Sequence, residues 1–273
     1  YAQILIERFE ESLEIIRASE ITFAAQGDTI NQARCWFTEA SCLRRQSHFD
    51  QAQKKLEQAM RVFQREDLPS DIAKTHYQCA LIHLLRTDDL SIAISHFETA
   101  IQIFDRCDLD LWQAACFTNL GSVYIQNGLF IQAEDSIKQA RISFMRHDVF
   151  GLLADNLNDS GKLNTLRGLL HTSFEQFKQA EKIYSQLGMK LRASSTMANI
   201  GEVYGKLGRY QDALHYLEQA AKQLESLENY LRLGTCERYT ALIWHRLRQS
   251  KYAHEYLDKA VIHYEKAGQK AYI

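Results

Sequence analysis

Apolar and small residues recur along the chain at helical spacing, in blocks separated by short turns. Ala213, Leu217 and Ala220 illustrate the pattern, because steps of four and three residues place all three on one helix face. A single proline in 273 residues leaves little to interrupt such blocks. The pattern predicts about thirteen helices. Their expected limits are 3–25, 30–45, 49–65, 70–87, 90–105, 109–127, 130–146, 150–167, 170–187, 190–207, 210–226, 230–248 and 251–267.

The blocks repeat in pairs. Residues 119–140, 159–180 and 199–220 align without gaps, which gives a period of 40 residues. Two sets of glycines are in register, namely Gly121, Gly161 and Gly201, and Gly128, Gly168 and Gly208. The first set lets paired helices approach closely, and the second suits helix ends that need a positive φ. Because one helix pair cannot bury its apolar face alone, the pairs are expected to stack into an α-solenoid.

These spacings resemble the signature of the tetratricopeptide repeat. One repeat alone fills seven signature positions with Leu120, Gly121, Tyr124, Gly128, Phe130, Ala133 and Ala140. The period differs from the usual 34 residues or so, and the closing proline is absent. The resemblance implies an all-α, right-handed solenoid. The 40-residue period makes the sequence similar to the long-period repeats of bacterial regulatory proteins, such as arrays fused to CHAT-type cysteine proteases and the sensor regions of regulatory ATPases.

The array is expected to form one domain over residues 1–273, with an unpaired first helix followed by about six repeats. The chain begins with Tyr1 rather than methionine and already lies within an amphipathic pattern. We therefore expect it to be a fragment of a longer protein.

Composition narrows the compartment and the class of partner. Lysine and arginine number 32 against 34 acidic residues, and the net charge of −2 argues against a dedicated nucleic-acid binder. Contact with nucleic acid through a ribonucleoprotein partner stays open. No apolar run is long enough to span a membrane. The six cysteines show no disulfide framework, so reduced thiols and a cytoplasmic location are expected.

Motifs that carry chemistry are missing. The sequence has neither a phosphate-binding Gly-x-x-x-x-Gly-Lys loop nor a Gly-x-Ser-x-Gly nucleophile turn. Cys79 and His83 are four residues apart and could share a metal ion, but two ligands without a second pair make a weak site, and ordinary packing is favoured. Cys116 lies within a helix and lacks the glycine that a caspase-type nucleophile needs. We predict no catalytic residue, no cofactor and no metal, and hence no enzyme in this segment.

The remaining candidate is a surface. In tetratricopeptide arrays the first helix of each pair lines the concave face, and its ligand-facing positions carry over by register. An offset of 41 residues relates the first complete repeat to the second. The expected partner-binding residues are Arg34, Phe37, Arg44, Arg45, Gln78, Arg86, Asn158, Lys162, Arg238, His245 and Arg246.

Arginines at both ends of the array favour an acidic or carboxyl-terminal peptide segment, because guanidinium groups bind carboxylates through two parallel hydrogen bonds. The alternative is a solvated helix face with intramolecular ion pairs. The carboxylate clamp that holds chaperone tails is not reproduced, since only Asn158 and Lys162 come near it.

The functional prediction is a non-catalytic protein–protein interaction scaffold. It would be the repeat region of a larger regulatory protein, binding a protein or peptide on its concave face and relaying this to an effector domain. The alternative is a peptide sensor whose superhelix changes pitch on binding.

Overall fold

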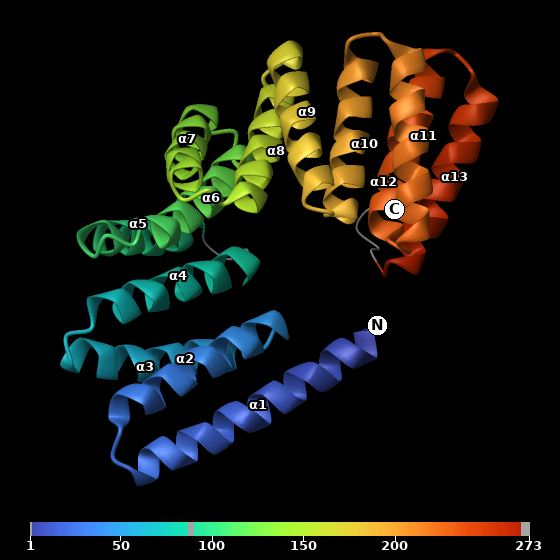
Figure 1. The fold of residues 1–273 in the computed structure, drawn as a ribbon. Helices are drawn as coiled ribbons and strands as arrows, with labels where there is room; N and C mark the ends of the chain where they lie inside the picture. Colours follow the sequence, from blue (N-terminus) through green and yellow to red (C-terminus); the bar gives the residue numbers. More distant parts are fainter. Residues whose placement is uncertain (1, 87–89, 269–273) are drawn as a thin grey trace. The chain divides into compact units, whose positions relative to one another are not determined.

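The computed structural model describes residues 2–86 and 90–268, with side chains from Glu10 onward in these ranges. The described residues form thirteen α-helices and no strand, which confirms the all-α prediction (Figure 1). The helices are α1 (Ala2–Ala25), α2 (Thr29–Arg45), α3 (Phe49–Arg65), α4 (Pro69–Arg86), α5 (Leu90–Arg106), α6 (Asp110–Gln126), α7 (Phe130–Arg146), α8 (Phe150–Leu166), α9 (Leu170–Gln186), α10 (Lys190–Lys206), α11 (Tyr210–Ser226), α12 (Tyr230–Arg246) and α13 (Ser250–Lys266). Tyr1, residues 87–89 and residues 269–273 of the expected array lie outside the described ranges.

One turn geometry connects most of the helices. Gly128, Gly168 and Gly208 have φ values of 70°, 75° and 75°, as predicted for this set. Between residues 128 and 268 a residue with positive φ occurs every 20 positions, and non-glycine residues fill some of these places. The predicted helix 230–248 ran too far because Arg248 occupies such a place, with φ 59°. Within this range each helix and its turn therefore form a module of constant length.

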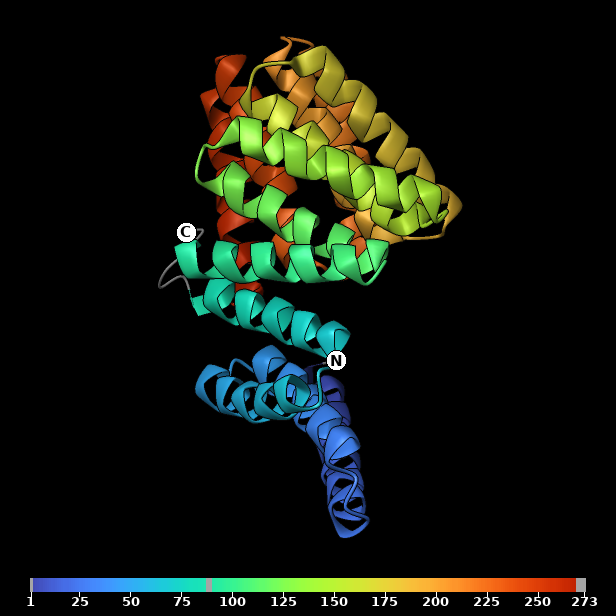
Figure 2. The ribbon, with the colours of Figure 1, turned by 90° about the vertical axis from the view of Figure 1, so that its left-hand side faces the viewer.

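The chain divides into two compact units, Tyr1–Val123 and Tyr124–Ile273. In the first unit α1 packs on α2, α2 on α3, α3 on α4 and α4 on α5, so that these helices lie in layers (Figures 1 and 2). In the second unit each helix from α7 to α13 packs on the next. Five of the six expected pairs are present, namely α2–α3, α4–α5, α8–α9, α10–α11 and α12–α13, while the single array over 1–273 stays a prediction.

Small residues set the spacing inside the pairs. A Cβ atom placed on Gly201 would lie 2.7 Å from Cγ of Leu217 on the paired helix, and one on Gly161 would lie 2.6 Å from Cε1 of Phe177. Neither distance is tolerable for a carbon pair. These contacts confirm the close approach that the sequence predicts. The apolar stripe is also confirmed, since Ala213, Leu217 and Ala220 have no exposed surface.

Candidate partner-binding surface

Two neighbouring arginines stand out on α2. The Nε of Arg44 donates to Oε1 of Gln78 on α4 over 3.0 Å, and Arg44 is half-buried. The next residue, Arg45, is exposed. Burial and the positive charge of Arg45 lower the pKa of Arg44. No carboxylate among the described residues pairs with either guanidinium group, so this point of the surface carries uncompensated positive charge.

The other predicted residues of this repeat have intramolecular roles. Arg34 is paired, with Nη2 at 2.9 Å from Oδ2 of Asp71 at the start of α4. Phe37 is partly buried and packs between the apolar clusters of α2 and its neighbours. Arg34 therefore matches the alternative of a solvated face with an ion pair, and Phe37 contributes packing.

The structure corrects the register of α4 by one residue. Buried alanines relate α2 to α4 with an offset of 40, since Ala33 and Ala40 correspond to Ala73 and Ala80. The offset of 41 placed Phe37 on Gln78, but Gln78 is only 9% exposed. The position equivalent to Phe37 belongs to Tyr77.

The one-residue error in the offset also affects Arg86, the second residue predicted on α4. The offset of 41 placed Arg45 on Arg86, whereas an offset of 40 places it on Leu85. Arg86 is directed toward α3, where its Nη2 lies 3.0 Å from Oδ1 of Asp50.

With the corrected register, a strip of polar and aromatic groups crosses the first unit. Beyond Arg44 and Gln78, the hydroxyl of Tyr77 accepts a hydrogen bond of 3.3 Å from Nδ2 of Asn119 on α6. Trp112 packs edge-on against Tyr77 with ring centroids 5.6 Å apart. The sequence reasoning missed Tyr77 and Trp112, although the alanine offset of 40 would have identified Tyr77.

Asparagines make the equivalent contact in the second unit. Oδ1 of Asn158 on α8 accepts from Nδ2 of Asn199 over 3.1 Å and from Oγ1 of Thr196 over 3.3 Å, both on α10. Lys162 is bound within its own helix, with Nζ at 2.9 Å from Oδ1 of Asp159. Asn158 thus links two first helices, while the charge of Lys162 is compensated locally.

The three predicted residues of α12 do not form one site, because Arg246 makes different contacts from Arg238 and His245. Arg238 and His245 line one hollow of about 360 Å³ between α12 and α13, together with Leu242 and Leu257. The guanidinium carbon of Arg238 also lies 4.7 Å from the ring centroid of Tyr239. Arg246 instead donates from Nη1 to the carbonyl oxygen of Gly205 over 3.0 Å and so ties α12 to α10.

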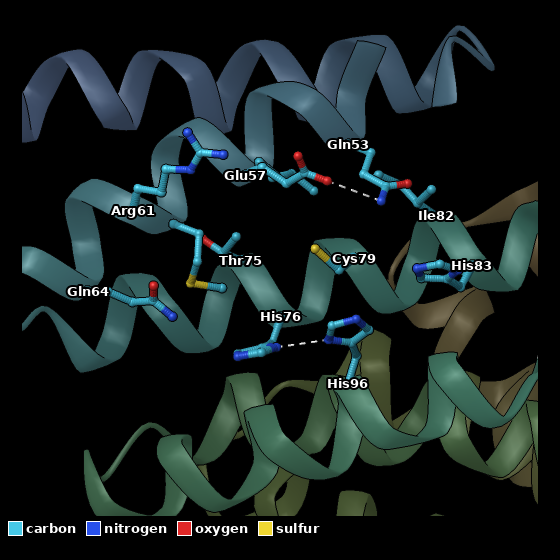
Figure 3. Close-up of a pocket in the computed structure, with 12 residues that line it drawn as sticks. Gln53, Glu57, Arg61, Gln64, Thr75, His76, Cys79, Ile82, His83 and His96 are labelled. Carbon is cyan, nitrogen blue, oxygen red and sulfur yellow. Dashed lines mark hydrogen bonds between the residues drawn. The ribbon is translucent and has the colours of Figure 1, made fainter. Parts of the chain in front are cut away.

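Each unit also contains a cavity between the second helices of two neighbouring pairs and the first helix that lies between them. In the first unit α3, α4 and α5 enclose a cavity of about 420 Å³ (Figure 3). In the second unit α11, α12 and α13 enclose one of about 600 Å³. The lining residues that α3 and α11 contribute correspond position by position, with Leu56 and Glu57 matching Leu217 and Glu218. Equivalent cavities therefore occur in both units. The tetratricopeptide signature does not predict them, because its positions are those that pack the helices together.

The cavity of the first unit contains both residues of the weak metal pair. Cys79 and His83 line it together with His76 and His96. Burial raises the pKa of Cys79 to about 12, so its thiol stays protonated at neutral pH. Among the described residues no group of three or more histidine, cysteine, aspartate or glutamate side chains is placed to hold a metal ion. No helix in the described ranges is long and apolar enough to cross a bilayer.

Two family models match different parts of the chain. Residues 152–226 match the tetratricopeptide repeat, and residues 16–150 match the soluble NSF attachment protein family. No curated protein sequence matches the chain. The repeats are therefore similar to those of tetratricopeptide-like scaffold families, which are typical of protein–protein interaction and are typically non-catalytic.

Solved structures show the same fold at low sequence identity. A signal-transduction ATPase with numerous domains from Pyrococcus horikoshii, which carries a tetratricopeptide repeat sensor, is 12% identical with a TM-score of 0.80 over 97% of this chain and 42% of its own. The apo form of RapI is 13% identical, with a TM-score of 0.75 over 98% and 96%. A Rap protein complexed with competence and sporulation factor is 13% identical, with a TM-score of 0.65 over 89% and 78%.

Proposed function

We propose that the chain is the repeat region of a larger regulatory protein and that its first unit binds an acidic segment of a partner protein. The binding point is the pair Arg44 and Arg45 on α2, flanked by Tyr77 and Gln78 of α4. Binding there is relayed to an effector domain elsewhere in the full protein.

The observation that carries the proposal is the uncompensated charge of Arg44. A half-buried guanidinium group beside a second one is electrostatically unfavourable until an anion binds both. A carboxylate satisfies this need best, because it accepts two parallel N–H bonds from each guanidinium group. The single interhelical bond to Gln78 fixes the side chain of Arg44 and leaves its other donors for a ligand.

The regulatory role is supported by two relatives in fold. One is described as carrying a tetratricopeptide repeat sensor, and the other is complexed with competence and sporulation factor. The fold that this chain shares with those two proteins supports a similar task for it.

An oligoglutamate peptide labelled with fluorescein tests the proposal by fluorescence anisotropy at low salt. We expect Arg44→Glu/Arg45→Glu to weaken binding by at least about tenfold, or about 1.4 kcal/mol. The matched control is Lys54→Glu/Arg106→Glu, which reverses two exposed charges on α3 and α5 of the same unit. Equal weakening by both variants would show nonspecific attraction, and wild-type protein that prefers an uncharged peptide would exclude an acidic partner.

The sensor hypothesis predicts a different result with the same peptide. A sensor changes its helix packing when the ligand binds, whereas a scaffold does not. Small-angle scattering of the protein with and without saturating peptide separates the two, and an unchanged profile counts against the sensor.

A further inference from the structure

One helix of the second unit, α7 (Figure 1), carries a stripe of exposed apolar side chains. Ile131, Ile142 and Met145 are 76%, 53% and 61% exposed. Their spacing along the sequence places all three on one side of the helix. The stripe extends for about 21 Å along the helix axis, because each residue adds about 1.5 Å.

Packing of the repeats does not require apolar residues at these three positions. In the neighbouring repeats the equivalent positions are all polar and exposed. They are Ser91, Gln102 and Asp105 on α5, His171, Lys182 and Ser185 on α9, and Gln211, Lys222 and Glu225 on α11. Since a contiguous apolar patch is unusual on the surface of a monomer, the stripe on α7 indicates contact with another molecule.

Two opposite charges lie between the apolar residues of the stripe. Asp135 and Lys138 are both exposed. With them, steps of four and three residues alternate from Ile131 to Met145. This alternation is the spacing of a seam between two paired helices, in which polar residues specify the register. The stripe is therefore suited to a second helix that presents apolar and charged groups in the matching order.

The charge of Lys138 is available to such a helix. Its Nζ atom lies 3.1 Å from Oε1 of Glu134, and its side chain is 60% exposed. Glu134 has a second cation, because Nη1 of Arg167 lies 2.7 Å from its Oε2 atom. An exposed ion pair contributes little stability, so Lys138 can turn to another carboxylate while Glu134 keeps Arg167.

A second copy of α7 in antiparallel orientation matches the stripe. With a two-fold axis between residues 136 and 137, Ile131 lies opposite the partner's Ile142, and Asp135 lies opposite the partner's Lys138. The symmetry makes each contact twice. An axis that instead sets Ile131 against the partner's Met145 would set Lys138 against the partner's Lys138, which like-charge repulsion disfavours.

We propose that α7 is a self-association surface through which two copies of this chain form an antiparallel, two-fold symmetric dimer. The apolar pairs provide the attraction, and the pairs of Asp135 with the partner's Lys138 set the orientation and register. A seam along one helix falls short of the roughly 1,200 Å² that a stable interface buries in total. The dimer is therefore weak and reversible, with a dissociation constant in the micromolar range.

Sedimentation equilibrium of the whole chain, from about 1 to about 500 µM under reducing conditions, measures the dissociation constant. We expect Ile142→Glu to weaken the dimer by at least about tenfold, because each dimer then buries two unpaired carboxylates. The matched control is Ile262→Glu on α13, where Ile262 is 49% exposed at the position equivalent to Ile142. This control is expected to dimerise within about twofold of wild type.

Reversal of the charges tests the register. Asp135→Lys sets two lysines against each other on both sides of the axis, and Lys138→Asp does the same with two carboxylates. Each is expected to weaken the dimer by at least about fivefold. The double variant Asp135→Lys/Lys138→Asp restores opposite charges and is expected to return to within about threefold of wild type.

All of these substitutions are on an exposed helix face, and circular dichroism checks that each variant keeps its helicity. A wild-type chain that stays monomeric at the highest concentration would overturn the proposal. So would an Ile142→Glu variant of native helicity that dimerises like wild type. A double charge variant that fails to recover would exclude the antiparallel register.

Discussion

Three of the six cysteine side chains are buried between the helices. Cys116 and Cys236 have no exposed surface, and Cys35 is 9% exposed. Burial raises the pKa of both Cys116 and Cys236 from 9.0 to about 12. At this scale the sequence was informative, since the absence of a framework spacing predicted free thiols, and all six cysteines are free.

The two raised values make stability depend on alkaline pH. A thiol whose pKa is higher in the folded state holds its proton between about pH 9 and pH 12, while the unfolded chain loses it. The free energy of unfolding is therefore expected to be unaffected by these groups below pH 9 and to fall as the pH rises above it. Urea unfolding at a series of pH values under reducing conditions measures this.

Cys116→Ser and Cys236→Ser provide the comparison for that series, because serine does not titrate in this range. An alkaline slope that persists undiminished in the double variant would assign the effect to other groups. Iodoacetamide labelling followed by mass spectrometry gives an independent check, in which the partly exposed Cys107 reacts before Cys116 and Cys236.

At the scale of helices, the spacing of a pair depends on the absence of one carbon atom. Gly201→Ala places a Cβ 2.7 Å from Cγ of Leu217 and 3.3 Å from the carbonyl oxygen of Ala213. The Cγ atom lies near the backbone and cannot swing away, so α10 and α11 must separate. We expect a loss of about 1–3 kcal/mol in the free energy of unfolding, measured by urea denaturation.

Gly151→Ala is the matched control on α8 in the same unit. Its Cβ would lie 3.4 Å from Cε of Met189, which is the mobile end of a flexible side chain. Its stability is expected to stay within about 0.5 kcal/mol of wild type or to rise, because alanine favours helix. If both substitutions had the same effect, close approach at Gly201 would not determine the spacing.

The helices and most of their pairs were predictable because the same pattern of apolar and small residues recurs in every repeat. The ends of the helices were harder to predict. Arg248, for example, adopts a left-handed conformation that is uncommon for arginine. The candidate site was partly misplaced for a similar reason. An offset measured on the second helices was applied to the first helices, and it moved the prediction from Tyr77 to Gln78. Contacts between helices, such as Arg246 with the carbonyl of Gly205, have no sequence signal at all.

At the scale of the whole molecule, the chain contains two units that each have their own core. The clusters around Leu56 and Phe63 belong to the first unit, and the large cluster around Ile200 and Leu217 belongs to the second. Contacts in a repeat protein are made mainly between neighbours, so damage is expected to stay near its origin.

Hydrogen exchange of Gly201→Ala tests this locality. We expect faster exchange in α9 to α12, which surround the substitution, and unchanged exchange in α2 to α5 of the first unit. The reason is that the disturbed cluster contains no residue of the first unit. Uniform acceleration along the chain would mean that the two units unfold as one.

The constant module length has a consequence for how such a chain can change. Between residues 128 and 268 the left-handed turn residue returns every 20 positions. Recombination between two copies of the repeat therefore inserts or removes whole helix pairs without rotating any buried face toward solvent. A chain built in this way can lengthen or shorten its helix stack in single genetic steps, while each remaining pair keeps the neighbours that its packing requires.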